Sequence, residues 1–353
     1  MHAAYKRFEC SNQASEAFDL VLEIEQKLEG CDSLFVNCFF ALNVALIVDH
    51  SLKSNDTKDD ITKRLRSCRS LLDIYLDFDG QDYFFSENLL SADSNTEKWD
   101  IAKEGFNYFW PRTTTGLDFE TSSLMAEERL DQFLALIDEE IDLPNSMLDI
   151  GCGPGRYLYA AKKRTDCLNS RLTGVDSGKS IIKSNKERQL LNGISFKEMD
   201  VRVTGITEQF DFVMCNGVAH HTGVPLSELI PQHAKLVSPR GCYFIFVYGD
   251  DGLELRSWEF LQRTIGRFSK EHVQVFLSKF ISPLRVQGIL DHTYGVFYRT
   301  TRVQIEELLQ NEFRLIKRVP GVAGLDVTEE LFADDPDFAF KAGSGNLRYL
   351  AFK

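Results

Sequence analysis

The stretch that decides the fold is MLDIGCGPGRYLYAAKKR, Met147 to Arg164, in which a short apolar run breaks into three glycines and continues as a helical pattern. A strand, a glycine-rich turn and a helix in this order bring bare backbone close to a ligand. Glycine permits positive φ angles, and the first turn of the helix presents N–H groups that have no partner within the helix. The stretch therefore predicts a nucleotide-type site.

The spacing of the glycines narrows the choice of ligand. Gly151, Gly153 and Gly155 read G-x-G-x-G, whereas the dinucleotide fingerprint is G-x-G-x-x-G and would need a glycine in place of Arg156. No GK[ST] follows, so the phosphate loop of nucleotide hydrolases is excluded as well. On the glycines alone, a tight strand-to-helix connection without any ligand remains an alternative.

Three acidic residues, each beside a predicted strand end, favour a ligand. Asp149 precedes the glycines, Asp176 follows the next strand in GVDSG, and Asp200 follows the third in FKEMDV. In a doubly wound fold Asp176 lies beside the first turn and can accept both hydroxyls of a ribose, although it and Ser177 also suit a helix N-cap. Asp200 can accept the exocyclic amine of adenine or serve as a solvated turn acid. Together the three acids favour a nucleoside-containing ligand.

The remaining pattern predicts an α/β fold with a doubly wound, seven-stranded sheet. Residues 1–95 form a helical N-terminal region, with apolar residues at helical spacing over 11–50, and 96–353 form the sheet domain. Strands that alternate with helices indicate parallel pairing with helices on both faces. A helical insertion or cap at about 251–290 precedes the last two strands. The predicted strands are SMLDIG, RLTGVDS, ISFKEMDV, FDFVMCNGV, CYFIFVYG, FRLIKRV and NLRYLAFK.

Composition limits the classes of function. The chain has 353 residues, 43% of them hydrophobic, and a formal net charge of -13. An acidic chain repels phosphate backbones, which argues against broad nucleic-acid binding. Eight cysteines without a CxxC pair indicate neither a disulfide scaffold nor a zinc site, so no metal is expected.

The sequence also bears on the compartment. The N-terminal MHAAYKRFECSNQ lacks the apolar core and cleavage site of a signal peptide. The most apolar run, Leu34 to Val48, is short for a bilayer and contains Asn37 and Asn43, so we expect a buried helix. These features predict a cytoplasmic protein with no membrane partner.

Five stretches together resemble the class I S-adenosylmethionine-dependent methyltransferases, in particular the small-molecule, ubiquinone-biosynthesis-like enzymes: LDIGCGPGRYL, GVDSGKSI, FKEMDV, FDFVMCNGVAHHT and LVSPRGCYFIFVYG. The resemblance covers roughly residues 145–250, plus the final helix and two strands. It implies a Rossmann-like sheet whose last strand runs antiparallel between its neighbours, a role that NLRYLAFK suits. SPRG, Ser238 to Gly241, departs from the proline and two glycines usual in the family, and we expect only a local change of turn there.

The resemblance implies S-adenosyl-L-methionine as the cofactor. Its methionine part and ribose would lie on the glycine turn, and Asp149 would orient its amino group. Asp176 and Ser177 would take the ribose hydroxyls, and Asp200 and Val201 the adenine. The full set of implied cofactor-binding residues is Asp149, Gly151, Cys152, Gly153, Gly155, Asp176, Ser177, Asp200, Val201, Asn216 and Gly217.

Methyl transfer from a sulfonium needs alignment of the nucleophile and exclusion of water, and it needs a base only where the nucleophile carries a proton. His220 and His221 follow the fourth strand and are the candidate bases. Alternatively, they only open the following helix and pack there. The candidates for a substrate contact or a lid are Tyr108, Trp110, Arg112, His292 and Tyr294. Ordinary packing is an alternative for these, and the 251–290 insertion could cap the site or form a homodimer face.

Three functions remain open. The first is methyl transfer to a small-molecule acceptor, and the second is methylation of tRNA or a protein. The strand end CNGVAHH lacks an Asn-Pro-Pro-Tyr-like tetrapeptide, which argues against methylation of exocyclic base amines. The third is a protein that binds S-adenosylmethionine without transferring its methyl group.

Overall fold

The computed structural model describes residues 16–54, 56–77, 119–164, 166–203, 205–295, 297–321 and 327–353. The chain forms two compact units, each built from three segments. Unit 1 comprises residues 1–91, 251–282 and 335–343, and unit 2 comprises 92–250, 283–334 and 344–353. Unit 2 contains every strand of the sheet, so it is described first.

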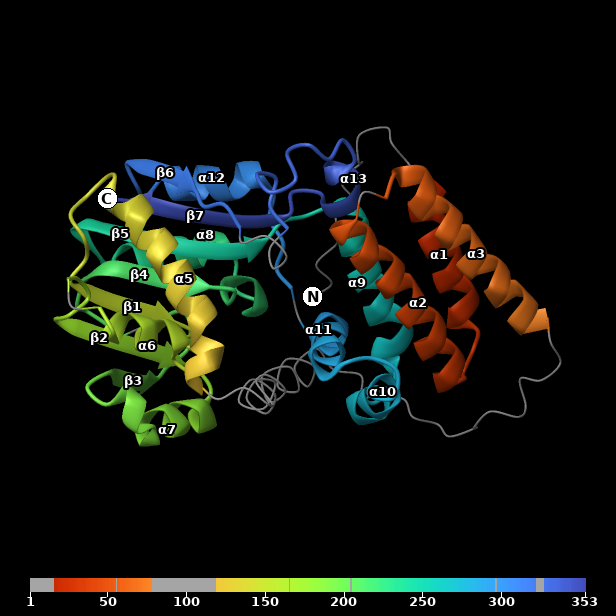
Figure 1. The fold of residues 1–353 in the computed structure, drawn as a ribbon, viewed down its shortest axis with the longest axis horizontal. Helices are drawn as coiled ribbons and strands as arrows, with labels where there is room; N and C mark the ends of the chain where they lie inside the picture. The colour runs from red at the N-terminus through yellow and green to blue at the C-terminus, as the bar shows by residue number, and fades with distance from the viewer. Residues whose placement is uncertain are drawn as a thin grey trace. The chain divides into compact units, whose positions relative to one another are not determined.

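Seven strands of unit 2 form one sheet in the order β3-β2-β1-β4-β5-β7-β6 (Figure 1). β3, β2, β1, β4 and β5 pair in parallel, and β7 runs antiparallel to both β5 and β6. This is the predicted doubly wound sheet with its antiparallel last strand between two neighbours. The strands are β1 Ser146–Ile150, β2 Arg171–Asp176, β3 Ser195–Glu198, β4 Phe210–Asn216, β5 Val237–Tyr248, β6 Leu315–Arg318 and β7 Asn346–Phe352.

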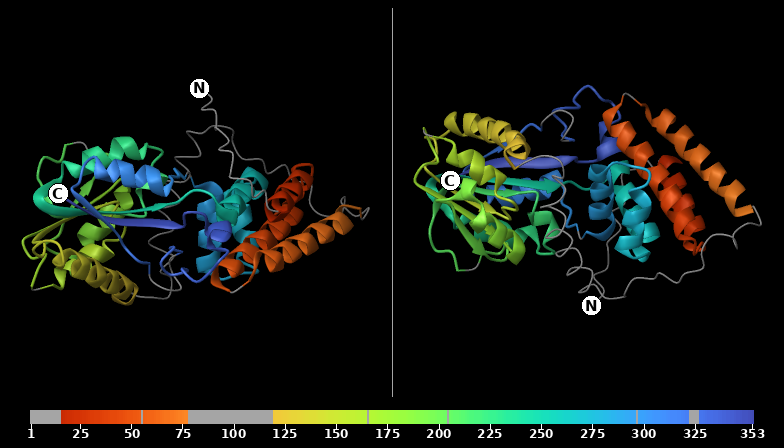
Figure 2. Two further views of the ribbon diagram at one scale, coloured as in Figure 1. Left: turned by 90° about the horizontal axis from the view of Figure 1, so that it is seen from above. Right: turned by 60° about the horizontal axis from the view of Figure 1, so that its bottom comes forward.

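Helices cover both faces of the sheet, which explains why β1 and β7 are buried along their whole length. On one face, Phe133 of α5 and Leu158 of α6 pack against Phe244 and other sheet residues. On the opposite face, Leu229 of α8 and Ile305 of α12 pack against the alternate side chains. Figure 2 shows α5 and α12 on opposite sides of the sheet. The helices of unit 2 are α5 Phe119–Asp138, α6 Arg156–Lys162, α7 Lys179–Glu187, α8 Leu226–Ala234, α11 Pro283–Tyr294 and α12 Arg302–Gln310.

Two local expectations were wrong. The helical pattern KSIIKSNKERQLLNG predicts a helix that ends at Gly193, but α7 ends at Glu187. A short 3-10 turn, Gln189–Leu191, follows it because Arg188 adopts an extended conformation. The turn expected at SPRG lies inside β5 instead. There, Val237 pairs with Phe210 and Cys242 with Phe212, so the intervening residues form an irregularity in the strand.

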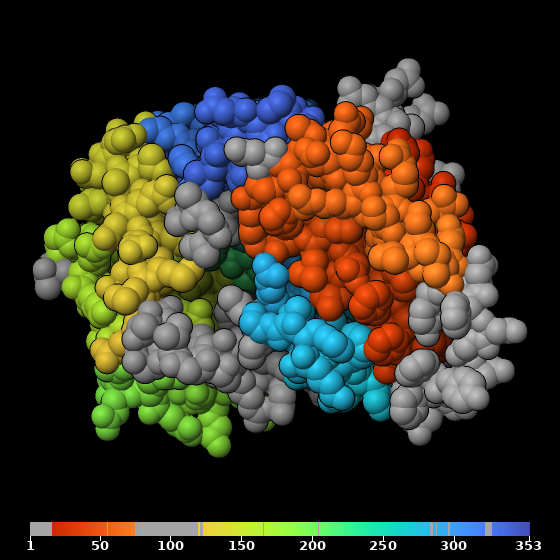
Figure 3. Space-filling model, turned by 45° about the vertical axis from the view of Figure 1, so that its right-hand side comes forward, coloured from red at the N-terminus to blue at the C-terminus, as the bar shows by residue number. Residues whose placement is uncertain are grey.

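Unit 1 is helical among its described residues. Two of its contacts join segments far apart in sequence: Glu25, which is 3% exposed, forms an ion pair with Arg263, and Arg267 donates to the side-chain oxygen of Asn37 at 3.1 Å. Figure 3 shows the surface of α3 in orange and that of α5 of unit 2 in yellow. The helices of unit 1 are α1 Glu16–Glu29, α2 Leu34–Lys53, α3 Lys58–Asp77, α9 Gly252–Thr264, α10 Lys270–Leu277 and α13 Phe338–Ala342.

The apolar run at Leu34–Val48 lies in α2. By length and composition alone, α2 is the one helix of the described chain that could cross a membrane, and half of the apolar stretch is buried within the structure. It contacts α3, α9 and α10 of the same unit. The side-chain amide of Asn37 donates to the carbonyls of Cys31 and Ser33 at 2.7 and 2.9 Å, which satisfies a polar group inside this apolar helix.

Candidate active site

The glycine turn leaves β1 and enters α6 with positive φ angles at Gly151, Gly153 and Gly155, of 73°, 50° and 82°. A side chain at Gly151 would overlap Val218, since its Cβ would lie 2.4 Å from a methyl carbon. At Gly153, by contrast, a Cβ would meet nothing within 4 Å. Gly151 is therefore required by packing, whereas Gly153 leaves the backbone open to an approaching ligand.

Asp176 connects the glycine turn to the end of β2. One carboxylate oxygen accepts from the backbone N–H of Gly153 at 3.0 Å, and the other accepts from that of Gly178 at 2.8 Å. The N-cap residue of α7 is Gly178, so Asp176 does not cap this helix. Ser177 lies between the two, half-buried. The arrangement holds a carboxylate at the edge of the open turn.

Asp149 is buried in the middle of a hydrophobic strand, with 3% of its surface exposed. Burial, together with the nearby carboxylate of Asp176, raises the pKa of Asp149 to about 8. Its carboxyl group is therefore largely protonated at neutral pH. A cation that approached it would favour the ionised form, so this residue is suited to an ammonium group.

Asp200 and Val201 follow β3, as expected, but their surroundings differ. Asp200 pairs with Arg202 at 2.7 Å, and its side chain is 50% exposed. Val201 packs against the hydrophobic cluster on the α8 face, and its carbonyl bonds a ring nitrogen of His233 at 2.8 Å. The solvated-acid alternative for Asp200 thus has support in its ion pair, whereas Val201 is held in place by a buried histidine.

Asn216 and Gly217 end β4 next to the turn. The side-chain oxygen of Asn216 is buried and has no hydrogen-bond partner among the described residues. Gly217 has a φ of 71°, and a Cβ there would touch Phe246 at 3.5 Å. A buried acceptor such as the oxygen of Asn216 is normally satisfied, which makes it a candidate ligand contact.

Cys152 of the glycine turn is buried, and burial raises the pKa of its thiol well above the ordinary value, so it is not a nucleophile at neutral pH.

His220 and His221 lie in a short 3-10 turn after β4, with ring centroids 4.2 Å apart. His220 is 1% exposed. Its ring centroid lies 4.5 Å from that of Tyr248 and 6.2 Å from that of Phe297. Burial, followed by the neighbouring His221 and His292, lowers the pKa of His220 well below its ordinary value, so the ring is neutral at pH 7.

The two nitrogens of His220 have different roles. Nδ1 is buried and has no hydrogen-bond partner among the described residues. The ring also forms a hydrogen bond with the backbone of Phe246. Because Nδ1 has no partner, the neutral ring can carry its proton on Nε2 and keep a lone pair on Nδ1. His220 is therefore arranged as a hydrogen-bond acceptor or a base.

Two further predicted substrate residues lie on α11. The ring of His292 stacks on that of Phe297 at 5.4 Å and lies 6.2 Å from that of Tyr248, which places it in the same aromatic group as His220. Burial and the nearby His221 lower its pKa to about 3. Tyr294 is the last residue of α11 and is half-buried. Tyr108, Trp110 and Arg112, the lid candidates, lie outside the described residues.

Sequence reasoning missed Tyr248, Phe297 and Arg348. Tyr248 ends β5 and Phe297 follows α11; neither forms part of a recognisable motif. Arg348 is 1% exposed in β7 and gave one signal, because an arginine within the apolar strand NLRYLAF is unusual.

We name the group around His220 the histidine–aromatic cluster; its members are His220, His221, Phe246, Tyr248, His292 and Phe297.

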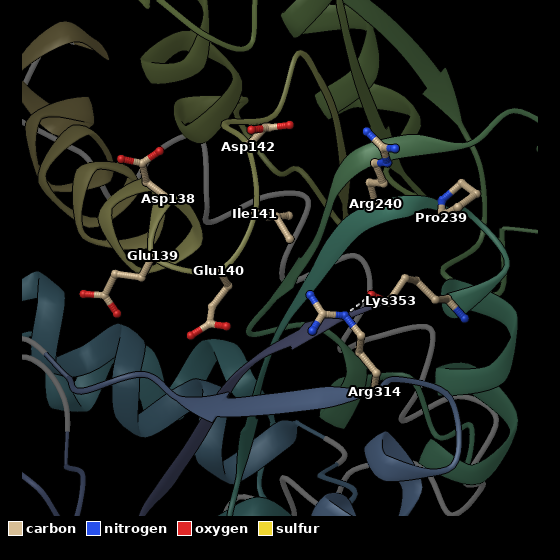
Figure 4. Close-up of a pocket in the computed structure, with 9 residues that line it drawn as sticks. All are labelled: Asp138, Glu139, Glu140, Ile141, Asp142, Pro239, Arg240, Arg314 and Lys353. Carbon is tan, nitrogen blue, oxygen red and sulfur yellow. Dashed lines mark hydrogen bonds between the residues drawn. The ribbon is translucent and has the colours of Figure 1, made fainter.

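A groove of about 540 Å³ lies at the end of the strands opposite to the glycine turn. Figure 4 shows acidic side chains after α5 on one side of it and basic side chains on the other. The start of β5 and the end of β7 border it, so it lies at the amino ends of the parallel strands, remote from the glycine turn. Within the described part of the chain, no group of His, Cys, Asp and Glu is placed to hold a metal ion. Charged residues lining the groove are Asp138, Glu139, Glu140, Arg240, Arg314 and Lys353.

Comparison with known proteins gives a match to a family model and distant similarities to solved structures. Residues 147–241 match a family model described as a methyltransferase domain. None of the curated protein sequences matches the chain. Among solved structures, the plantazolicin methyltransferase BpumL with S-adenosylhomocysteine is similar at 15% identity and a TM-score of 0.45, over 73% of this chain and 96% of that chain.

Two further structures show similar values. Magnesium protoporphyrin IX methyltransferase from Synechocystis has 14% identity and a TM-score of 0.41, over 72% of this chain and 99% of that one. The Burkholderia thailandensis 1,6-didemethyltoxoflavin-N1-methyltransferase has 16% identity and a TM-score of 0.40, over 76% and 97%. Similarity at this level says nothing about the substrate of this protein.

The sheet order with its antiparallel β7, the open G-x-G-x-G turn and the strand-end acids define a class I S-adenosylmethionine-dependent methyltransferase domain. Residues 147–241 match the methyltransferase-domain family model, and the protein is a methyltransferase that uses S-adenosyl-L-methionine. The chain fits this cofactor at two observed points, the space beside Gly153 and the buried oxygen of Asn216.

Proposed function

We propose that the protein transfers a methyl group from S-adenosylmethionine to a small molecule whose nucleophile is a hydroxyl or an N–H group. The observation that carries the proposal is the buried Nδ1 of His220, which has no hydrogen-bond partner among the described residues. A ring nitrogen with a free lone pair can accept a hydrogen bond from the hydroxyl or N–H group of the molecule that is methylated. The cofactor supplies an electrophilic methyl group on a good leaving group.

Different residues of the chain would bind the cofactor, position its methyl group and take the proton of the nucleophile. The backbone at Gly153 and the carboxylate of Asp176 would bind the ribose, and Asp149 would bind the ammonium group. The side-chain oxygen of Asn216 and the neighbouring Gly217 would border the methyl group. As the bond from the nucleophile to the methyl carbon forms and the bond from sulfur to that carbon breaks, the proton of the nucleophile would pass to Nδ1 of His220.

Burial of His220 among half-buried aromatic neighbours supports a small acceptor, because a macromolecular substrate must reach the methyl group with a projecting side chain or a base. The formal net charge of -13 also disfavours an RNA substrate. The cluster excludes water from one side of the nucleophile, which strengthens the hydrogen bond at Nδ1.

The test uses S-adenosylmethionine labelled in its methyl group and a metabolite extract. We expect label in a low-molecular-weight product, identified by mass spectrometry as one member of a pair that differs by one methylene. His220→Gln should lower kcat by about 10²-fold or more, the range for loss of a general base. Its affinity for S-adenosylhomocysteine, measured by calorimetry, should change less than threefold.

His272→Gln is the matched control, because His272 is exposed on α10 of unit 1. It should leave both values unchanged. His221→Gln tests the second histidine of the pair and should have the smaller effect on kcat. Label found only in protein or RNA would refute the proposal, and a His220→Gln variant with more than a third of the wild-type kcat would remove His220 as the base.

A further inference from the structure

His233 is a fully buried histidine near the end of α8, and both of its ring nitrogens have partners. Nδ1 lies 2.8 Å from the hydroxyl oxygen of Tyr243, and Nε2 lies 2.8 Å from the backbone carbonyl oxygen of Val201. Burial lowers the pKa of His233 to about 4, so the ring is neutral at pH 7 and carries one proton. Because a carbonyl oxygen only accepts, that proton lies on Nε2, and Nδ1 accepts from the hydroxyl of Tyr243. Tyr243 therefore holds His233 in the tautomer that donates to Val201.

The carbonyl that His233 holds belongs to the turn after β3, residues 200–203, which we name the β3 turn. The side chain of Asp200 accepts from the backbone N–H of Arg202 at 3.0 Å. The peptide group between Val201 and Arg202 is thus held at its carbonyl by His233 and at its N–H by Asp200. A rotation of this peptide group would move the Asp200 carboxylate that is bonded to it.

The β3 turn also contains a strained residue. Val203 has a φ of 47°, a left-handed conformation that β-branched residues rarely adopt, and it is 4% exposed. Its backbone N–H donates to the carbonyl of Asp200 at 2.9 Å, which closes the turn. Such a conformation persists only where the surrounding contacts determine it. The bond from His233 is one of these contacts, so its loss should let the turn relax.

The β3 turn lies beside the predicted ribose site. In the sheet, Asp176 is the register partner of Glu198, and the backbone N–H of Met199 donates to the carbonyl of Asp176 at 2.9 Å. Ligands of doubly wound sheets bind outside the carboxyl ends of the strands. A nucleoside whose ribose bonds the Asp176 carboxylate therefore has the β3 turn within reach of its base.

We propose that His233 is a positioning residue for the cofactor, which fixes the β3 turn so that the carboxylate of Asp200 meets the exocyclic amine of adenine. His233 does not touch the cofactor, because it is fully buried and both ring nitrogens bond within the protein. It acts through the carbonyl of Val201, and Tyr243 selects its tautomer. The inference concerns the cofactor alone, so it does not depend on which acceptor is methylated.

The test compares two ligands that differ at the base. S-adenosylhomocysteine carries adenine, and S-inosylhomocysteine carries hypoxanthine, in which a carbonyl oxygen replaces the amine. Calorimetry on the full chain at pH 7 gives both dissociation constants without any acceptor. We expect the wild type to prefer S-adenosylhomocysteine at least tenfold, because a carboxylate accepts from an amine and repels a carbonyl oxygen. Equal affinities in the wild type would overturn the inference.

Variants then assign this preference to His233. His233→Phe lacks the donor to Val201 and should lower the preference below threefold, whereas His233→Gln keeps an N–H group at the end of its side chain and should retain most of it. The double variant with His233→Phe and Tyr243→Phe leaves no buried hydroxyl unpaired, so it serves where His233→Phe alone does not fold. A wild-type preference in either phenylalanine variant would overturn the inference.

A double-mutant cycle separates positioning from general destabilisation. Asp200→Ala and His233→Phe should each weaken S-adenosylhomocysteine binding at least fivefold. Combining them should weaken it less than twofold beyond Asp200→Ala, because both changes remove one contact. A further loss as large as that of His233→Phe alone would refute a role through Asp200.

Ser146→Ala is the matched control. Its hydroxyl donates to the carboxylate of Asp211 at 2.9 Å at the start of β1, the other end of the strand from the glycine turn. The variant loses a hydrogen bond of the same domain and should keep the wild-type preference for S-adenosylhomocysteine. A preference that fell in this control as far as in His233→Phe would show that it follows stability rather than the β3 turn, and the inference would be wrong.

Discussion

We expect the raised pKa of Asp149 to make cofactor binding a proton-coupled event. With a pKa of about 8, the group is about nine-tenths protonated at pH 7. An ammonium group beside it would favour the ionised form and displace that proton. We expect S-adenosylhomocysteine binding at pH 7 to release close to one proton, seen in calorimetry as a binding heat that differs between phosphate and Tris buffers. Asp149→Asn should abolish the difference, and Asp142→Asn, which alters an exposed acid, should preserve it.

The same residue predicts how stability depends on pH. Its pKa lies at about 8 in the folded protein against an ordinary value of 3.8, a difference worth roughly 6 kcal/mol at about 1.4 kcal/mol per pH unit. Because the folded state holds the proton more tightly, the penalty is absent below about pH 4 and complete above about pH 8. The free energy of unfolding should therefore fall over this window in the wild type and fall less in Asp149→Asn. Identical pH profiles, or a binding heat that is the same in both buffers, would refute this account of Asp149.

Other predictions concern the turn, the ribose site and unit 1. Asp176→Ala should weaken S-adenosylhomocysteine binding tenfold or more in calorimetry, and an unchanged affinity would mean that the ribose lies elsewhere. Gly153→Ala should lower stability by only about 1–2 kcal/mol through its positive φ while impairing cofactor binding. Gly151→Ala should lower the melting temperature more because of its overlap with Val218. Glu25→Ala should destabilise unit 1 by about 1 kcal/mol in a denaturation series, since it removes a buried carboxylate from its ion pair with the exposed Arg263; full stability would show that the pair contributes nothing.

The sheet could be predicted because its information is local. The central strands β1, β4, β5 and β7 are largely apolar, and the alternation of strands with helices determines parallel pairing. The glycines and acids at strand ends meet at one edge for the same reason, as the bond between Asp176 and Gly153 shows. Only local details failed, such as the early end of α7, where the extended backbone of Arg188 interrupts a sequence that is periodic beyond it.

The sequence names His220, His221 and His292 as candidates, but it could not predict how the histidine–aromatic cluster comes together, because the cluster depends on contacts between distant segments. His292 lies on α11, far from His220 in the sequence, and joins its cluster through the ring of Phe297. The helical spacing of apolar residues does not predict which other segment α11 contacts. Arg348 was legible only as an odd residue in an apolar strand. The surroundings of its guanidinium could not be predicted, because the rings of Phe244 and Phe133 that contact it belong to β5 and α5.

The discontinuity of unit 1 has a consequence for synthesis. Helices α1 to α3 end at Asp77, but α9 and α10, against which α1 and α2 pack, begin only at Gly252, and α13 lies later still. On a ribosome that adds about 5–20 residues per second, the first three helices wait on the order of ten to thirty seconds for their partners. During that interval the part of the apolar surface of α2 that packs against α9 and α10 in the folded protein lacks those partners. The nascent chain is therefore expected to need a chaperone most while the sheet of unit 2 is being made.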